Sequence, residues 1–200
     1  MIYICHRINK KAELQRIPKE YGVELDLRDA LDGSVYLEHD PFKLGEDFET
    51  YLSDYRHGLM ILNIKSERIE EKVLKLVKKA GVSQFFFLDC SFPMVFALSN
   101  AGIKNIALRF SEYEGLDTLR SMAGKISWVW ADCFTKCPLT EEGYHELKNL
   151  GYRICIVSPE LQGRPQDIEQ YAAFLQERSM TPDAVCTKFA NLPIWKKYYP

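Results

Sequence analysis

Short apolar or alternating runs recur along the chain every 20 to 30 residues or so, and most are followed by a segment with helical periodicity. Buried strands of a parallel sheet have this appearance when a helix connects each strand to the next. Eight runs can be recognised. They cover residues 2–5, 23–27, 59–64, 84–88, 105–108, 127–131, 152–157 and 184–186.

Helical patterns lie between these runs. The clearest covers residues 67–80, where Ile69 and Val73 lie about one turn apart on an apolar face. Gly81 follows and predicts the end of this helix. The other patterns cover residues 92–101, 117–123, 140–150 and 165–178.

Eight strand–helix units in one domain, residues 1–200, predict a small α/β protein of the closed (β/α)8, or TIM, barrel type. An open doubly wound sheet is the alternative. No G-x-G-x-x-G motif and no P-loop follows any of the runs, so the nucleotide-binding versions of that open fold have no support.

The segment 23–40, VELDLRDALDGSVYLEHD, carries the densest group of candidate functional residues. In an extended conformation Glu24 and Asp26 share one face, because side chains alternate along a strand. Asp32-Gly33 predicts a tight turn, after which a short strand at 35–37 returns towards His39. Two carboxylates and an imidazole could form an acid/base or metal site, although an ordinary half-exposed antiparallel strand has the same alternation.

Polar residues also end most of the other predicted strands. In a parallel barrel these carboxyl ends meet at one face, so their side chains are expected to converge on a single site. A charged group there must be paired or hydrated, because burying it alone is costly. The residues are His6, Arg7, Asp26, Arg28, Asn63, Lys65, Asp89, Arg109, Asp132, Ser158, Thr187 and Lys188.

These residue types suit reactions of a phosphate ester. Glu24 and Asp26 offer the oxygen ligands that a hard divalent cation prefers, and His6 and His39 could act as a general acid and base. Positive charge for an anionic group is available from four further residues. They are Arg7, Lys65, Arg109 and Lys188.

Charge and composition exclude several other classes. With 26 basic and 28 acidic residues the net charge is −2, which gives no reason to expect a nucleic acid or a membrane surface as partner. Only five apolar residues precede His6, too few for the core of a secretion signal. Cys133 and Cys137 lack a second pair of zinc ligands. We therefore expect a reduced, cytoplasmic protein with a small-molecule substrate.

The order of these motifs resembles the glycerophosphodiester phosphodiesterase family, whose barrel superfamily also includes phosphatidylinositol-specific phospholipases C. The resemblance spans the chain, but its most specific part lies in the first 65 residues. It rests on His6-Arg7, Glu24-x-Asp26, Asp32-Gly33, His39-Asp40 and Asn63-Ile64-Lys65.

The resemblance implies a metal-dependent phosphodiesterase that cleaves a glycerophosphodiester-like substrate into a phosphomonoester and an alcohol. His6 and His39 would be the acid/base pair, and Arg7 and Lys65 would bind the phosphate. Magnesium or calcium would be held by a third group of residues. These are Glu24, Asp26 and Asn63.

The chain departs from the family pattern at several positions. Asn63 stands where the family has a glutamate ligand, and Asp89 is a candidate to replace the missing charge. The segment that follows His39-Asp40 is short, about residues 41–57. A barrel that binds phosphate or phosphodiesters without turnover is therefore the alternative. Action on lipid head groups would require an apolar rim at the barrel mouth, of which residues 51–60 offer little.

Overall fold

The structure, a computed structural model, describes residues 1–200. Its centre is a sheet in which eight parallel strands follow one another in the order β6-β5-β2-β1-β10-β9-β8-β7. The ladder is interrupted between β6 and β7, which are joined by one isolated bridge between Phe87 and Ile106. The parallel strands are β1 (Ile2–Cys5), β2 (Gly22–Asp29), β5 (Met60–Ile64), β6 (Phe85–Leu88), β7 (Ala107–Phe110), β8 (Trp128–Ala131), β9 (Arg153–Val157) and β10 (Ala184–Thr187).

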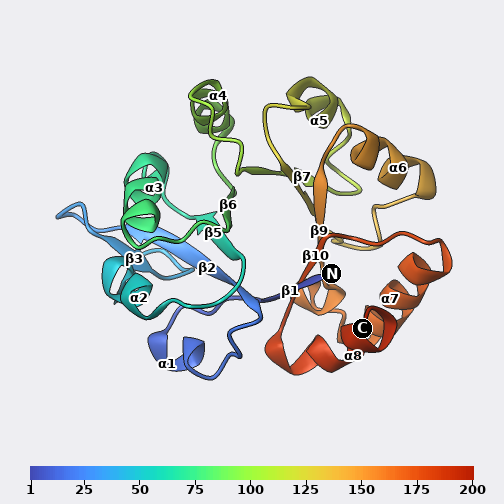
Figure 1. Ribbon diagram of the computed structural model, residues 1–200, viewed down its shortest axis with the longest axis horizontal. Helices are drawn as coiled ribbons and strands as arrows, with labels where there is room; N and C mark the ends of the chain where they lie inside the picture. Colours follow the sequence, from blue (N-terminus) through green and yellow to red (C-terminus); the bar gives the residue numbers. More distant parts are fainter.

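The helices lie outside this ring of strands, as Figure 1 shows. The five predicted helices are present, although the pattern at 165–178 begins as the 3-10 turn Pro165–Asp167 before it becomes α-helical. The alternation of strand and helix confirms the predicted barrel fold. The helices are α1 (Lys11–Leu14), α2 (Phe48–Asp54), α3 (Glu70–Lys79), α4 (Phe92–Asn100), α5 (Asp117–Met122), α6 (Glu141–Asn149), α7 (Ile168–Glu177) and α8 (Leu192–Tyr198).

Two short antiparallel strands extend the sheet beyond β2. β3 (Val35–Leu37) pairs with β2, and β4 (Glu46–Asp47) pairs with β3. Gly33 has a φ of 79°, which glycine adopts without the penalty that a side chain would bring, and so permits the predicted turn. The loop between β2 and β3 projects beyond the ring of helices at the left of Figure 1.

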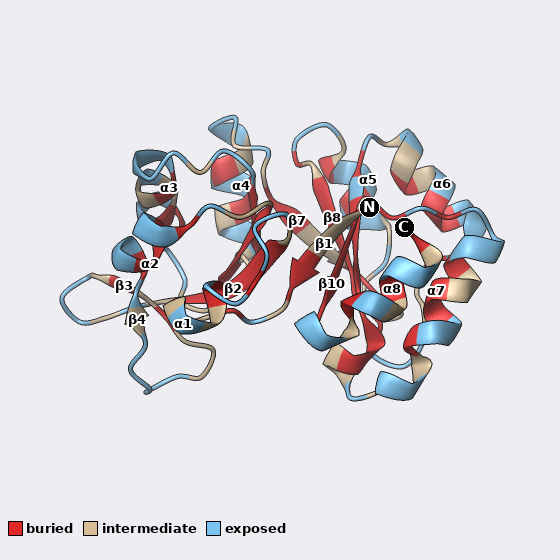
Figure 2. Cartoon of the chain, turned by 60° about the horizontal axis from the view of Figure 1, so that its bottom comes forward, coloured by how far each residue is buried: buried red, intermediate tan, exposed pale blue.

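Large apolar side chains fill the interior, so the barrel is not a pore. Phe86 of β6 stacks on Trp128 of β8 with ring centroids 4.6 Å apart, and both side chains are fully buried. Figure 2 shows the strands as the buried part of the molecule and the outer faces of the helices as exposed. The filled interior places the available space at the ends of the strands.

The C-terminal helix α8 is fixed to the barrel by a buried tryptophan. Trp195 is fully buried, and its Nε1 donates a hydrogen bond of 2.8 Å to Oγ of Ser158, just after β9. Ser158 Oγ in turn donates to the buried Glu160 carboxylate, which also accepts from Thr187 Oγ1 at 2.5 Å. This network ties the ends of β9 and β10 together beside the barrel mouth.

None of the helices combines the length and the apolar character needed to cross a membrane.

Candidate active site

A cavity of about 220 Å³ lies at the carboxyl ends of the strands. Six of the seven predicted site residues line it, and the seventh, Glu24, contacts three of those six. The six residues come from β2, β5 and the segments that follow β1, β3 and β5. They are His6, Arg7, Asp26, His39, Asn63 and Lys65.

Glu24 lies beneath the cavity and is 1% exposed. Its Oε2 accepts a hydrogen bond of 2.8 Å from the backbone N–H of Arg7, and its Oε1 accepts one of 2.8 Å from Nδ2 of Asn63. Nε2 of His6 lies 3.6 Å from the same carboxylate. The β2–β5 register, which pairs Asp26 with Asn63, explains why two strands deliver polar groups to one place.

Burial controls the protonation of this pair. Burial, together with the charge of Asp26, raises the pKa of Glu24 to about 7. Burial and the charge of Arg7 lower the pKa of His6 to about 4. His6 is therefore a neutral imidazole at neutral pH, able to accept a proton, and its contact with Glu24 is not an ion pair of two full charges.

Asp26 is held by donors on three sides. The Asn9 side chain makes two hydrogen bonds of 2.9 Å with this residue. Its Nδ2 donates to the Asp26 carboxylate, and its Oδ1 accepts from the Asp26 backbone N–H. Nζ of Lys65 and Nε of Arg7 each lie 3.6 Å from the Asp26 carboxylate. The carboxylate thus positions the two cations that were predicted to bind phosphate.

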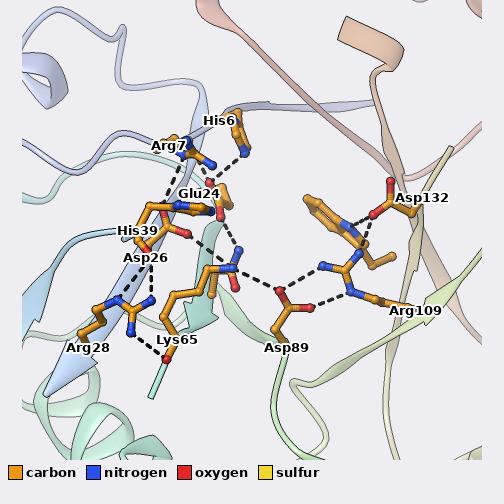
Figure 3. A network of polar contacts seen from close by, with 12 residues as sticks. His6, Arg7, Glu24, Asp26, Arg28, His39, Lys65, Asp89, Arg109 and Asp132 are labelled. Atoms are coloured by element: carbon orange, nitrogen blue, oxygen red, sulfur yellow. Dashed lines mark hydrogen bonds and ion pairs between the residues drawn. The ribbon is translucent and has the colours of Figure 1, made fainter. Parts of the chain in front are cut away.

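A chain of ion pairs continues from Lys65 across the mouth, as Figure 3 shows. Lys65 Nζ lies 3.3 Å from Asp89, and Asp89 accepts two hydrogen bonds from Arg109, of 2.7 and 3.0 Å. Arg109 also contacts Asp132 at 2.5 Å. Asp89 is therefore engaged by Lys65 and Arg109 and does not join the Glu24–Asp26 pair.

His39 reaches the cavity from the loop after β3. Its Nδ1 lies 2.7 Å from Oδ1 of Asp40. Hydrogen bonds from Lys43 and His39 lower the pKa of Asp40 to about 2, so its carboxylate is charged and accepts the Nδ1–H of His39. Nε2 of His39 is then the nitrogen that remains free for contact with a substrate.

Arg28 fixes the backbone of this loop and that of the segment after β5. Its Nη2 donates a 2.7 Å hydrogen bond to the carbonyl oxygen of His39, and its Nη1 donates a 3.1 Å bond to that of Lys65. Figure 3 shows its guanidinium between the two carbonyl groups. Arg28 thereby couples the position of an imidazole to that of a lysine predicted to bind phosphate.

The fit of this site to a divalent cation depends on Asn63. No group of three or more His, Cys, Asp or Glu side chains has a metal-binding arrangement. Asn63 Oδ1, however, is buried and has no hydrogen-bond partner, while its Nδ2 contacts Glu24. A buried oxygen without a partner is unfavourable unless something else satisfies it. Asn63 Oδ1 and the carboxylates of Glu24 and Asp26 are oxygen donors, the type that a hard cation prefers.

Some predicted residues lie elsewhere, and some lining residues were missed. Lys188 is exposed and does not line the cavity, although its charge contributes to the lowered pKa of His6. Asn9, Trp130 and Gln162 were not predicted to belong to the site. Trp130 Nε1 and Gln162 Nε2 both donate to Asp132, at 3.3 and 2.7 Å. In the sequence, only the position of Asn9 directly after the His6-Arg7 motif could have indicated that it belongs to the site.

The structure is similar to solved glycerophosphodiester phosphodiesterases. One from Agrobacterium tumefaciens has a TM-score of 0.69 and 15% identity, covering 100% of this chain and 99% of its own. One from Parabacteroides distasonis has a TM-score of 0.64 and 12% identity, covering 97% of this chain and 84% of its own. This chain has the fold of the glycerophosphodiester phosphodiesterases.

A phosphodiesterase from Oleispira antarctica, in complex with the product sn-glycerol-3-phosphate, has a TM-score of 0.69 and 14% identity. It covers 100% of this chain and 96% of its own. No protein-family profile and no curated protein matches the sequence. The family fold predicted from the motifs is thus confirmed, at an identity that fits a divergent sequence.

Proposed function

We propose that this protein is a phosphodiesterase that hydrolyses a glycerophosphodiester-like small molecule to a phosphomonoester and an alcohol. The observation that carries the proposal is the meeting of two imidazoles, two cationic side chains and a buried carboxylate in one cavity at the barrel mouth. They are His6, His39, Arg7, Lys65 and Asp26.

The two imidazoles suit the proton transfers of this reaction. One removes the proton from the attacking hydroxyl, of water or of the substrate itself, as its oxygen forms a bond to phosphorus; a cyclic phosphate made by a substrate hydroxyl is then opened by water. The other gives a proton to the departing oxygen as the phosphorus–oxygen bond of the leaving alcohol breaks. His6, whose pKa is lowered to about 4, is neutral at the start and suits the role of base, which leaves His39, oriented by its contact with Asp40, for the role of acid.

Arg7 and Lys65 suit the role of holding the phosphate. Each lies 3.6 Å from the Asp26 carboxylate, which helps to fix where the two cations point. Charges held in place before the reaction need no rearrangement when negative charge develops on the phosphoryl oxygens. This supports a binding role for both side chains.

Glu24, Asp26 and Asn63 are the residues that would hold a metal ion. Bound magnesium or calcium would draw charge from the phosphoryl oxygens and lower the pKa of the attacking hydroxyl. Binding requires Glu24 in its charged form and Asn63 Oδ1 turned towards the ion. The unpartnered state of that oxygen supports this assignment.

A chromogenic phosphodiester assay with EDTA, magnesium, calcium or manganese tests the proposal. We expect metal-dependent turnover that falls by at least about a hundredfold in His6→Ala and in His39→Ala. His145→Ala is the matched control, because His145 is exposed on α6, and it should retain full activity. Equal activity in all three variants would contradict the assignment of the imidazoles.

Binding without turnover is a second candidate, supported by one observation. The Asn63 amide donates to Glu24, where a family glutamate would add negative charge for a cation. If wild type is inactive and Asn63→Glu gains metal-dependent activity, the barrel is a phosphodiester-binding protein with an incomplete metal site. Activity in wild type would exclude this second candidate.

A further inference from the structure

Two neighbouring hollows lie on the amino-terminal face of the barrel, opposite to the face that carries the active-site cavity. Their volumes are about 430 and 380 Å³, within the range of small-molecule sites. The segments that precede β5, β6 and β7 contribute most of their lining. Residues 81–83 line both hollows, so the two share this short segment as a wall. We call the pair the basal hollows.

Basic side chains line the basal hollows, and no acidic side chain does. Arg56 and His57 line one hollow, and Lys78 and Lys104 line the other. The chain as a whole has 28 acidic residues and a net charge of −2. Two adjacent hollows without one carboxylate are therefore a local excess of positive charge on a protein that is slightly negative.

Three of these cations are not neutralised within the chain. The ion pairs, with N–O distances up to 4.0 Å, include none of Arg56, Lys78 and Lys104. Asp54, whose charge is felt by Arg56, is itself paired with Lys11 at 2.7 Å. The carboxyl ends of helices attract cations, which explains why basic residues stand here. It does not explain why the acids that could pair with them are missing.

The shared wall adds hydrogen-bond donors that the chain leaves unused. The backbone N–H groups of Ser83 and Gln84 have no backbone acceptor. Ser83 also offers a hydroxyl group at an exposed position. His57 is engaged through Nε2, 2.8 Å from the carbonyl oxygen of Ile17, so the three unpaired cations carry the charge. Backbone N–H groups, hydroxyl groups and basic side chains together are the donors that bind phosphate oxygens.

We propose that the basal hollows bind a small polyanion with at least two phosphate groups, one in each hollow. An unpaired Arg56 in one hollow, and Lys78 and Lys104 in the other, favour two anionic groups over one. The basal hollows share no lining residue with the active-site cavity. The inference is thus independent of the proposed function and stands whether or not the barrel hydrolyses phosphodiesters.

A small molecule is favoured over a nucleic acid or a membrane surface. The unpaired cations surround hollows that match the size of a small ligand, and they do not form an extended stripe. The net charge of −2 also gives no general attraction for an extended polyanion.

Calorimetry with inorganic phosphate and with tripolyphosphate, both in EDTA so that no metal ion bridges the ligand to the protein, tests the proposal. We expect tripolyphosphate to bind at least about tenfold more tightly than phosphate, with an affinity that falls as salt is added. Lys78→Ser/Lys104→Ser should weaken it at least about tenfold. Lys19→Ser/Lys125→Ser removes the same charge from exposed positions outside the hollows and should leave it unchanged.

A further variant separates the basal hollows from the active-site cavity, which has cations of its own. Arg7→Ser/Lys65→Ser removes two cations of the cavity and should retain the binding of tripolyphosphate. In that variant, tripolyphosphate should shift the amide NMR signals of residues 81–84 and 102–105.

Several results would overturn the proposal. Loss of binding in Arg7→Ser/Lys65→Ser would place the ligand in the active-site cavity. Equal weakening in Lys78→Ser/Lys104→Ser and Lys19→Ser/Lys125→Ser would mean that general surface charge, and no site, attracts it. Binding of duplex DNA or of phosphatidylglycerol vesicles, with none of tripolyphosphate, would assign this face to a macromolecular partner and the proposal would be wrong.

Discussion

Asn63 donates its side-chain amide to Glu24 across the β2–β5 pair at 2.8 Å, while its own Oδ1, buried beside the cavity, has no partner. This arrangement satisfies one oxygen of a buried carboxylate without adding charge. It also leaves Asn63 Oδ1 able to accept a hydrogen bond or to bind a cation. The buried carboxylates are therefore stabilised within the chain, by a hydrogen bond from Asn63 and by the charges of Arg7 and Lys65.

Asn63→Glu should make stability depend on metal. The substitution removes the amide donor to Glu24 and adds a third carboxylate that is repelled by the two buried ones. We therefore expect a loss of roughly 2–4 kcal/mol in the free energy of unfolding with EDTA. Magnesium or calcium should restore most of it, because a cation binds only the folded site. Thermal unfolding with EDTA, magnesium or calcium measures this. An identical Tm in all three buffers would contradict the assigned donor set.

Asp89→Asn should lower the free energy of unfolding by an amount that depends on pH. Burial disfavours the charged form of Asp89, but its hydrogen bonds and ion pairs with Arg109 and Lys65 outweigh this and lower its pKa. A lowered pKa in the folded state gives stability that is present above the unfolded-state pKa, about 3.9 for an aspartate. That stability is lost as the pH falls through the folded-state pKa.

Urea unfolding of wild type and Asp89→Asn between pH 7 and pH 3 measures this difference. We expect wild type to be more stable by about 1–3 kcal/mol at pH 7, with the gap closing below about pH 4. Asp117→Asn is the control: Asp117 is 97% exposed in its contact with Arg120, and exposed pairs contribute little. A gap that stays constant down to pH 3 would contradict the role given to Asp89.

Arg28→Ala should impair catalysis more than stability. Without the guanidinium, the carbonyl groups of His39 and Lys65 lose a common donor, and the imidazole is no longer held relative to the lysine. A misplacement of about 1 Å can cost around a hundredfold in rate, so we expect kcat to fall by about ten- to a hundredfold. Faster hydrogen exchange at residues 38–40 should accompany the loss. Arg16→Ala, at an exposed position, should change neither quantity.

Trp195→Phe should lower stability and leave the chemistry intact. The change removes the hydrogen bond to Ser158 and part of a fully buried ring, so we expect a loss of about 1–3 kcal/mol. Urea unfolding followed by circular dichroism measures it. Tyr198→Phe on the same helix should cost less than about 0.5 kcal/mol. Equal stability of the two variants would mean that Trp195 does not anchor α8.

Local patterns predicted the parts of the site that depend on single strands. Alternation alone placed Glu24 and Asp26 on one face of a strand, and the Asp32-Gly33 turn correctly predicted the return strand Val35–Leu37. Strand β7 begins at Ala107, two residues later than its pattern suggested, because the apolar Ile106 makes only the isolated bridge to β6.

Contacts that depend on three-dimensional distance could not be predicted. No periodicity in the sequence predicts the two hydrogen bonds between Asn9 and Asp26, or the contact of Arg28 with the His39 carbonyl. Asp89 could be named as a possible metal ligand because it ends a strand, yet its bonds to Arg109 depend on the distance between β6 and β7. The basic lining of the basal hollows carried no signal, since Arg56, Lys78 and Lys104 each lie near the carboxyl end of a helix, where cations are common.

Phosphorus-31 NMR of glycerophosphocholine incubated with the protein and magnesium tests the central claim most directly. We predict that the phosphodiester signal is replaced by that of a phosphomonoester with wild type and persists with His6→Ala and with His39→Ala. A phosphodiester signal that remains unchanged with wild type, in magnesium, calcium and manganese alike, would contradict the claim that this barrel hydrolyses glycerophosphodiesters.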